Sequence, residues 1–275
     1  MPDGLNSKYE ALKDYFNALP GVAIAFSGGV DSTFLLYAAH EALGRKVLAV
    51  TADNGAIPES ELAMAKDFCH RHGIEHVIVA TRVLDLSEIA GNPRNRCYLC
   101  KKYIFGKFIK EAGAKGYNIL CEGSNTDDQG VYRPGLLALE ELEVLSPLKE
   151  LDFSKEEIRE MSRRLLLDTY DKPSYPCLFT RFPYGEEIND EKLSRVAKAE
   201  EKLKEMGFRN FRVRSHGDLA RIELQPAEFE EFMKQDTRTA VYDYLIQTGF
   251  DYVSLDIMGF RSGSMDEAMF RKTDE

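Results

Sequence analysis

The chain has 275 residues, of which 44% are hydrophobic, and 36 Lys and Arg residues against 46 Asp and Glu give a formal net charge of −10. This length allows one large domain or two modest ones. The acidic balance argues against tRNA or DNA as the main partner, because a polyanion is repelled unless the basic residues cluster strongly. The N-terminus has no basic region followed by an apolar core, and no run of about 18 apolar residues occurs. We therefore expect a soluble, cytoplasmic protein without a membrane partner.

Apolar runs alternate with helix-like segments through the first two thirds of the chain. The predicted strands are residues 22–26, 47–50, 76–80, 118–122 and 143–148, and the predicted helices are residues 33–43, 59–72, 98–112 and 154–167. This alternation predicts an α/β fold with a parallel sheet that is covered on both faces and binds ligands at the carboxyl ends of its strands. Three loops follow such ends, at residues 27–32, 51–55 and 123–128.

The first predicted strand runs into the sequence Ser27-Gly28-Gly29-Val30-Asp31-Ser32, and a predicted helix follows at once. Glycines let the backbone approach a bound group closely, and the N-terminus of a helix favours anions. The motif is not a Walker loop, because it lacks the lysine and its glycines are adjacent. A glycine turn that only joins strand to helix is the alternative.

This motif resembles the pyrophosphate loop (PP loop) of the N-type ATP pyrophosphatases, which split ATP between its α and β phosphates. In that family the backbone amides and the two serines hold the pyrophosphate, and the aspartate helps to place Mg²⁺. The resemblance therefore implies an ATP site, with magnesium, at Ser27, Gly28, Gly29, Asp31 and Ser32.

The two other loops also carry candidate ligands. Asp53 in "TADNG" is a candidate nucleotide contact, although Asp-Asn-Gly is equally suited to a simple turn. The stretch "EGSNTDDQGVYRPG" contains Asp127, Asp128 and Arg133, which suit Mg²⁺ and a phosphate. Solvated loop charges are the alternative interpretation.

Five cysteines without an export signal indicate reduced thiols or metal ligands rather than a disulfide framework. Cys97 and Cys100 form a C-x-x-C pair at the start of a predicted helix, and Cys177 stands in the loop that ends the nucleotide-binding region. If the sheet is parallel, these two loops lie above the same edge, so the three thiolates could meet near the ATP. Cys69 and Cys121 fall on an amphipathic helix and a strand, which is typical of core residues.

Three cysteines with no obvious fourth ligand suggest a [4Fe–4S] cluster with one open iron, because cluster irons are normally ligated by thiolate. An open iron can carry exogenous sulfide. A zinc site completed by a histidine, or unrelated thiols of which only Cys177 is catalytic, are the alternatives.

The pattern changes after the segment "DKPSYPCLFTRFPYG", which ends at Gly185. We place a boundary there, giving a PP-loop domain at 1–185 and a smaller α+β domain at 186–275 for substrate binding and oligomerisation. Its predicted helices are 189–206, 226–232 and 236–248, and its predicted strands are 211–215, 220–224 and 252–257. Alternation in "FRVRS" puts Arg212 and Arg214 on one strand face. A solvated face is the alternative.

The stretches "FSGGVDS", "EGSNTDD…YRPG", "CLFTRFPYG", "FRVRSHGDLARIEL" and "GFRSG" together resemble the LarE family over nearly the whole chain. These ATP-dependent sulfurtransferases build the pincer ligand of the nickel cofactor of lactate racemase. The resemblance implies an adenine-nucleotide alpha-hydrolase-like fold. It also implies that ATP adenylates a carboxylate of pyridinium-3,5-biscarboxylic acid mononucleotide, releasing pyrophosphate, and that sulfur then replaces AMP. Two rounds give the bisthiocarboxylate.

The same resemblance assigns further roles. Cys177 matches the sulfur-donating cysteine that single-cysteine members convert to dehydroalanine. Cys97 and Cys100 stand where those members have no cysteine, which suggests the variant whose cluster carries a hydrosulfide, with sulfide or another sulfur donor as partner. The family's basic positions match Arg181, Arg212 and Arg214, which suit the phosphate and carboxylates of the substrate. Weaker metal or polar-network candidates are Glu200, Glu223 and Asp256. A homo-oligomer such as a hexamer is also implied.

Three rival functions share some of these features. A tRNA thiolation enzyme also combines this loop with three cluster cysteines, but the net negative charge of this chain would repel tRNA. An amide-forming ligase such as an NAD or GMP synthetase shares the ATP loop and gives the cysteines no role. A non-catalytic sensor would bind nucleotide and cluster without turnover.

Overall fold

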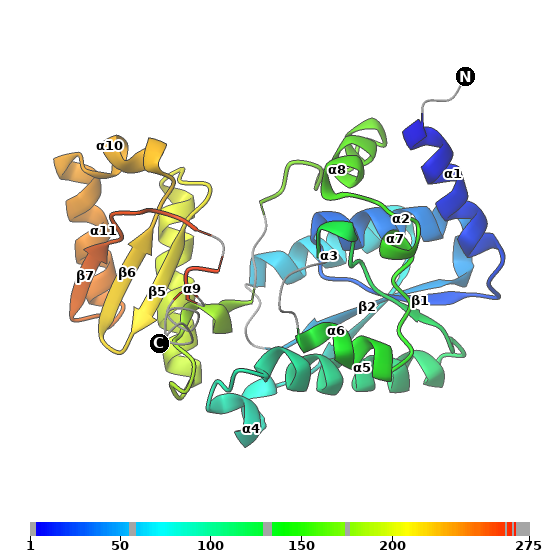
Figure 1. The fold of residues 1–275 in the computed structure, drawn as a ribbon, viewed down its shortest axis with the longest axis horizontal. Helices are drawn as coiled ribbons and strands as arrows, with labels where there is room; N and C mark the ends of the chain where they lie inside the picture. The colour runs from blue at the N-terminus through cyan, green and yellow to red at the C-terminus, as the bar shows by residue number, and fades with distance from the viewer. Residues whose placement is uncertain are drawn as a thin grey trace. The chain divides into compact units, whose positions relative to one another are not determined.

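The computed structural model describes residues 4–54, 59–128, 134–173, 177–261, 263–265 and 267 (Figure 1). Contacts divide the chain into unit 1, Met1–Val83 with Asn95–Ser174, and unit 2, Leu84–Arg94 with Tyr175–Glu275. The short segment joins unit 2 through backbone hydrogen bonds from Gly185 N to Asn92 O at 3.0 Å and from Ile188 N to Ala90 O at 2.8 Å. The domains expected at 1–185 and 186–275 remain a prediction, because contact density does not test which segment folds on its own.

Unit 1 is built on a parallel sheet of four strands in the order β3-β2-β1-β4. The strands are β1 (Val22–Ala25), β2 (Val47–Asp53), β3 (Glu75–Ala80) and β4 (Leu120–Cys121). β1 and β2 are buried along nearly their whole length, which explains why they are continuous apolar runs in the sequence. The predicted α/β fold with a parallel sheet is confirmed.

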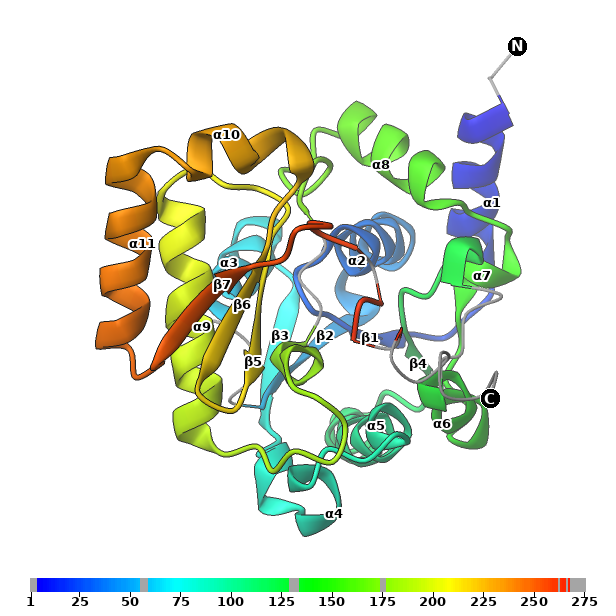
Figure 2. The ribbon, with the colours of Figure 1, turned by 60° about the vertical axis from the view of Figure 1, so that its left-hand side comes forward.

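Helices cover both faces of this sheet. On one face lie α1 (Gly4–Asn17), α2 (Val30–Leu43), α3 (Glu59–His72) and α8 (Lys155–Arg164). On the other lie α5 (Arg96–Ala114) and α6 (Pro134–Glu141), as Figure 2 shows. Val22 and Ile24 of β1 pack into the first core and Ala23 into the second, because successive side chains of a strand point to opposite faces.

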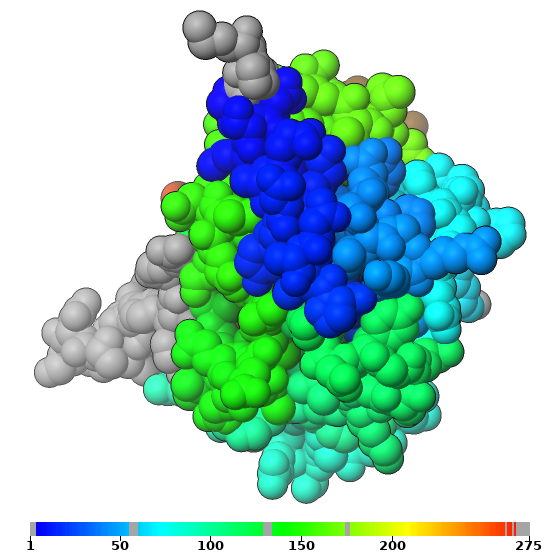
Figure 3. All heavy atoms as spheres, turned by 90° about the vertical axis from the view of Figure 1, so that its right-hand side faces the viewer, coloured from blue at the N-terminus to red at the C-terminus, as the bar shows by residue number. Residues whose placement is uncertain are grey.

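Two features of unit 1 differ from the sequence prediction. Residues 143–148 do not form a strand and contribute only a parallel bridge from Leu145 to Cys121. Pro147 begins α7 (Pro147–Glu150) at this point, and a proline has no N–H to continue a strand ladder. α6 was not predicted, and neither was α1, an N-terminal helix that lies along the surface of unit 1 and buries Tyr9, Leu12 and Phe16 (Figure 3).

Unit 2 is a smaller α+β unit with a sheet in the order β5-β6-β7. β5 (Arg212–His216) and β6 (Leu219–Glu223) are antiparallel, and β7 (Tyr252–Leu255) is parallel to β6. Beside the sheet lie α9 (Asp190–Glu205) and α11 (Gln235–Gln247) (Figure 2). A short helix, η4 (Leu178–Arg181), begins directly after Cys177.

The remaining short elements are η1 (Gly44–Lys46), η2 (Val83–Asp85), α4 (Ser87–Ala90), η3 (Thr126–Asp128), η5 (Pro226–Glu228) and α10 (Phe229–Phe232). Among the described residues, no helix combines the length and the apolar character needed to cross a membrane.

Candidate functional site

The PP loop links the end of β1 to the start of α2 in unit 1. Gly28 has a φ of +71°, a left-handed conformation that side-chain-bearing residues rarely adopt. The two serine hydroxyls of the loop face each other, with 3.1 Å between Ser27 Oγ and Ser32 Oγ. Ser32 Oγ also accepts a hydrogen bond from Ser27 N at 3.2 Å and donates one to Gly29 O at 3.2 Å. Both predicted pyrophosphate-binding serines therefore lie at the mouth of one tight loop.

Asp31 lies in the first turn of α2, beside this loop. Its Oδ2 accepts a hydrogen bond from Lys155 Nζ at 2.5 Å, and its Oδ1 accepts one from Asn125 Nδ2 at 3.3 Å. Burial raises the pKa of Asp31 above its ordinary value, although the ammonium of Lys155 acts in the opposite direction. The carboxylate of Asp31 beside the loop is therefore partly desolvated and is paired with the ammonium of Lys155.

The loop after β4 packs closely against the PP loop at Gly123. A Cβ on Gly123 would lie 3.1 Å from Ser32 N and 3.2 Å from the carbonyl carbon of Asp31. Glu122 is buried and fixes the start of this loop by accepting hydrogen bonds from Ser124 N at 3.0 Å and Ser146 Oγ at 2.6 Å. The sequence analysis placed no role on Gly123, although a glycine directly after a predicted strand was the available signal.

The carboxylates of this loop also have partners. Asp127 Oδ2 accepts a hydrogen bond from Lys155 N at 2.8 Å, and Asp128 Oδ2 accepts one from Asn125 N at 3.1 Å. Asp127 and Asp31 are thus joined through the same lysine. Arg133, predicted to contact phosphate, lies outside the described residues.

Asp53 ends β2 with an exposed side chain. Its backbone oxygen accepts a hydrogen bond from Thr81 N at 2.8 Å, which joins the ends of β2 and β3. The side chain therefore projects at the carboxyl edge of the sheet, where a nucleotide contact was predicted.

A second lysine braces the PP loop from a distant part of the chain. Lys172 Nζ donates to Gly28 O at 2.9 Å and to Glu61 Oε2 of α3 at 2.5 Å. Arg159 of α8 holds the same segment by donating to Lys172 O at 2.8 Å. The sequence analysis missed Lys155 and Lys172, because neither belongs to a motif.

The chain offers Mg²⁺ a suitable carboxylate at Asp31. Within the described ranges, no group of three or more His, Cys, Asp or Glu side chains could hold a metal ion. Such a group is not required in an ATP site, because Mg²⁺ there takes one or two carboxylates together with phosphate oxygens and water. The half-buried Asp31, which is already paired with an ammonium, fits this requirement.

The five cysteines separate into two classes. Cys69 and Cys121 are buried, and burial raises the pKa of each thiol to about 12, which confirms that they are core residues. Cys97 is exposed and Cys100 is partly exposed, and both lie in the first two turns of α5. A spacing of three residues puts them on one helix face, so they fit as two ligands of one cluster. Cys177 is exposed and belongs to unit 2, so the set of three ligands remains a prediction.

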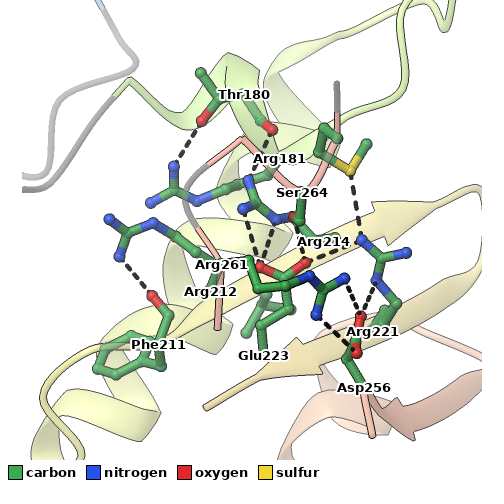
Figure 4. Close-up of polar contacts among 12 residues, drawn as sticks. Thr180, Arg181, Phe211, Arg212, Arg214, Arg221, Glu223, Asp256, Arg261 and Ser264 are labelled. Carbon is green, nitrogen blue, oxygen red and sulfur yellow. Dashed lines mark hydrogen bonds and ion pairs between the residues drawn. The ribbon is translucent and has the colours of Figure 1, made fainter. Parts of the chain in front are cut away.

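Glu223 is the centre of a buried network in unit 2 (Figure 4). Its Oε2 accepts hydrogen bonds from Arg214 Nη2 at 2.9 Å and Arg214 Nε at 3.1 Å. Its Oε1 accepts hydrogen bonds from Arg221 Nη2 at 2.9 Å and Ser264 Oγ at 2.6 Å. One buried carboxylate therefore orients two guanidinium groups of the sheet.

Arg212 and Arg214 are both buried, so they do not form a solvated strand face. Arg214 also donates from Nη1 to Thr180 O in η4 at 3.0 Å. Arg212 donates from Nη1 to Phe211 O at 2.5 Å (Figure 4). Its guanidinium lies 5.0 Å from the centre of the Phe260 ring. Burial lowers the pKa of Arg214, while the hydrogen bond to Glu223 opposes this effect.

Arg181 is fully buried and pairs with Glu200 of α9. Its Nη1 also donates to Thr180 Oγ1 at 2.7 Å, as Figure 4 shows. Arg181, which was predicted to bind substrate, therefore holds η4 against α9, and η4 is the element that follows Cys177 in the chain.

A third carboxylate, Asp256, joins the segment after β7 to this network. Asp256 Oδ1 accepts a hydrogen bond from Arg261 Nη1 at 3.2 Å, and Arg221 Nε lies 3.6 Å from Asp256 Oδ2 (Figure 4). The sequence analysis gave no role to Arg221 or Arg261, although both stand in the stretches "FRVRSHGDLARIEL" and "GFRSG". η4, the sheet and the segment after β7 therefore contribute five arginines, at positions 181, 212, 214, 221 and 261, together with the carboxylates of Glu200, Glu223 and Asp256. Guanidinium groups of this kind suit an anion.

Comparisons with known proteins agree with both units. The family model of queuosine biosynthesis protein QueC matches residues 21–93, which include the PP loop. The uncharacterized protein slr1717 of Synechocystis is 41% identical over 96% of this chain and 99% of its own length. The uncharacterized protein MJ0830 of Methanocaldococcus jannaschii is 31% identical over 88% of this chain and 91% of its own.

A relative with an assigned activity matches over a similar extent. Pyridinium-3,5-bisthiocarboxylic acid mononucleotide synthase of Lactiplantibacillus plantarum is 35% identical over 94% of this chain and 92% of its own length. The match therefore covers the PP loop, the exposed cysteine before η4 and the arginine cluster together. This chain belongs to the LarE family of ATP-dependent sulfurtransferases.

Proposed function

We propose that this protein uses ATP to convert the carboxylates of pyridinium-3,5-biscarboxylic acid mononucleotide to thiocarboxylates. The observation that carries the proposal is the match along nearly the whole chain to a synthase named for the bisthiocarboxylic product. In the first step a substrate carboxylate oxygen attacks the α phosphorus of ATP, and the bond to pyrophosphate breaks. In the second step a sulfur nucleophile attacks the activated acyl carbon, and AMP leaves.

Unit 1 supplies the ATP site in this proposal. The pyrophosphate is held by the PP loop through Ser27, Gly28, Gly29 and Ser32, and Asp31 holds Mg²⁺. Bound Mg²⁺ would neutralise part of the phosphate charge. Asp53, Asp127 and Arg133 are proposed as further contacts of the nucleotide or its metal. The close packing of Gly123 on Asp31 and Ser32 supports this assignment, because it holds the second loop against the first.

Unit 2 supplies the site for the substrate. Arg212 and Arg214 are proposed to bind its phosphate and carboxylates, with Arg181 holding the element beside them. Guanidinium groups form two-point hydrogen bonds with both kinds of anion. Their burial supports this assignment, because a buried cationic cluster gains most from a matching anion. Glu200, Glu223 and Asp256 orient the arginines.

Cys177 is proposed as the catalytic cysteine. Cys97, Cys100 and Cys177 would hold a [4Fe–4S] cluster, which when bound would supply an open iron for sulfide. The exposure of Cys177 and the shared helix face of the other two support this set of ligands. In the alternative, Cys177 gives up its own sulfur and becomes dehydroalanine.

The wider setting is also part of the proposal. The product would serve the nickel-pincer cofactor of lactate racemase, in the cytoplasm, with the protein acting as a homo-oligomer and inorganic sulfide or another donor supplying sulfur. These features rest on the family resemblance.

Anaerobic turnover tests the proposal. The protein is purified anaerobically, assayed for iron and sulfide, and incubated with ATP, Mg²⁺, sulfide and the pyridinium mononucleotide. We expect AMP, pyrophosphate and thiocarboxylate products by mass spectrometry, with none of them formed without the pyridinium substrate and no thiocarboxylate formed by C177A. Loss of H₂S from Cys177 after one turnover would favour the sacrificial route. Release of no AMP and formation of no thioacid would refute the function.

A further inference from the structure

The PP loop contains no lysine, whereas a Walker loop carries one that reaches the β and γ phosphates. The fold brings two lysines to the loop from 124 and 144 positions away in the sequence. Lys155 Nζ contacts Asp31 Oδ2 at 2.5 Å, and Lys172 Nζ contacts Gly28 O at 2.9 Å. Lysines from distant parts of the chain therefore provide the positive charge that the motif itself lacks.

The two lysines are not equivalent. The side chain of Lys172 is 11% exposed, and its ammonium is paired with the carboxylate of Glu61, which is 12% exposed. Lys172 therefore stabilises the loop from a largely buried position. The side chain of Lys155 is 31% exposed, and its ammonium rests on a carboxylate of the loop itself. Of these two lysines, only Lys155 therefore combines access to solvent with an ion pair to a side chain of the motif.

The backbone of Lys155 is fixed more firmly than its side chain. Lys155 is the first residue of α8, which Ser154 begins with a capping box that includes Glu157. Its N–H donates to Asp127 Oδ2 at 2.8 Å. A fixed Cα with a long, partly exposed side chain lets the ammonium exchange one anionic partner for another without moving the helix.

We propose that Lys155 is a phosphate-binding residue of the ATP site. Asp31 holds its ammonium beside the PP loop in the absence of nucleotide, and a phosphoryl oxygen becomes its partner when nucleotide is bound. This inference rests on the proposed function, in which the loop binds the pyrophosphate part of ATP.

Binding of inorganic pyrophosphate without Mg²⁺, measured by calorimetry at fixed ionic strength, tests the proposal. We expect K155M to weaken binding at least about tenfold, because it removes a charge-assisted hydrogen bond. K155R should recover most of the affinity, because it keeps the charge. Equal affinity of K155M and the unsubstituted protein would overturn the proposal.

K8M is the matched control. Lys8 is 32% exposed and pairs with Glu157 of α8 at 2.7 Å. The variant removes the same charge from α1, where the ammonium pairs with α8 but does not contact the PP loop, and it should leave pyrophosphate affinity within about twofold. A loss as large as that of K155M would mean that only the net charge matters, which contradicts the proposal.

A double-mutant cycle with D31N separates direct from indirect action. If Lys155 contacts phosphate, K155M still weakens binding about tenfold or more in the D31N background. If Lys155 only neutralises Asp31, the loss disappears in that background and the proposal fails. Unsubstituted protein that binds no pyrophosphate would instead refute the ATP site of the proposed function, and Lys155 with it.

Discussion

Arg181 and Glu200 form a buried two-point ion pair in unit 2. Arg181 Nε donates to Glu200 Oε1 at 2.6 Å, and Arg181 Nη2 donates to Glu200 Oε2 at 2.9 Å. Glu200 Oε1 also accepts a hydrogen bond from Val213 N at 3.0 Å. One carboxylate of α9 therefore joins η4 to β5, and it fixes the helix that begins after Cys177.

Removing this carboxylate should destabilise the protein strongly. We expect E200A to lower the free energy of unfolding by about 3–5 kcal/mol, because a buried guanidinium loses its partner. E201A is the matched control, since Glu201 is exposed on the same helix and lies 3.6 Å from Lys204. Its effect should stay within about 0.5 kcal/mol. Urea unfolding measures both, and equal losses would contradict the structural role of the pair.

The second prediction concerns Gly123, where the loop after β4 packs against the PP loop. G123A should cost about 1–3 kcal/mol of stability, because the new Cβ meets backbone atoms of Asp31 and Ser32 that cannot move aside separately. Pyrophosphate affinity should fall with it, since the PP loop itself must shift.

G106A is the control for this substitution. Gly106 lies within α5 and has nothing within 4 Å of its Cβ position, so alanine should stabilise the helix by up to about 1 kcal/mol. Thermal unfolding and calorimetry with pyrophosphate measure both variants. A G123A protein with unchanged melting temperature and affinity would show that the loops are not packed as described.

The pattern of hydrophobic residues in the sequence was enough to predict the paired strands β1, β2 and β3. β1 and β2 were found because parallel strands buried on both faces are continuously hydrophobic. β3 lies at the edge of the sheet and is only partly buried, and its β-branched residues were the signal. Cys69 was expected in the core because it lies on an amphipathic helix, and Cys121 because it lies in a strand, and both are buried. The α/β fold follows from the order of these segments.

Features that depend on distant contacts were not predictable in this way. Residues 143–148 look like a strand, but Pro147 allows only one bridge before a helix begins. Lys155 and Lys172 are ordinary surface residues in the sequence and reach the PP loop only through the fold. Arg212 and Arg214 were placed on one strand face, but their burial depends on Glu223 and on segments that pack over the sheet.

The cysteines give a third prediction that needs no cluster. In protein without iron, Cys97, Cys100 and Cys177 should react readily with a thiol reagent, because all three are exposed or partly exposed. Cys69 and Cys121 should react at least about 100-fold more slowly, because burial raises the pKa of both to about 12 and shields the sulfur.

Substitution assigns the reactive thiols. The C97S/C100S/C177S variant should lose the fast phase entirely and show its two remaining thiols only in denaturant. After reconstitution with iron and sulfide, C97S or C100S should lack the visible absorbance of a [4Fe–4S] cluster while still binding pyrophosphate. A cluster that persists when both are replaced would refute their assignment as ligands.

Asp256 makes the stability of unit 2 depend on pH. Burial acts to raise its pKa, but hydrogen bonds from Arg261 and the Met258 amide hold the pKa below the ordinary value of 3.8. A carboxyl whose pKa is lower in the folded state stabilises the protein above its unfolded pKa, and this contribution is lost as the pH falls through the folded value. D256N should therefore lower stability at pH 7 by about 1–2 kcal/mol.

The pH profile distinguishes charge from packing at this position. The difference in melting temperature between D256N and unsubstituted protein should be constant near neutral pH and shrink as the pH falls below about 3.8, because protonation of the carboxyl then favours the unfolded state until the folded carboxyl is neutral too. D251N, at an exposed aspartate just before β7, should show no such change. If the D256N difference is the same from pH 7 to pH 3, the contribution of Asp256 comes from its shape and hydrogen bonds, and its charge does not hold Arg261 in place.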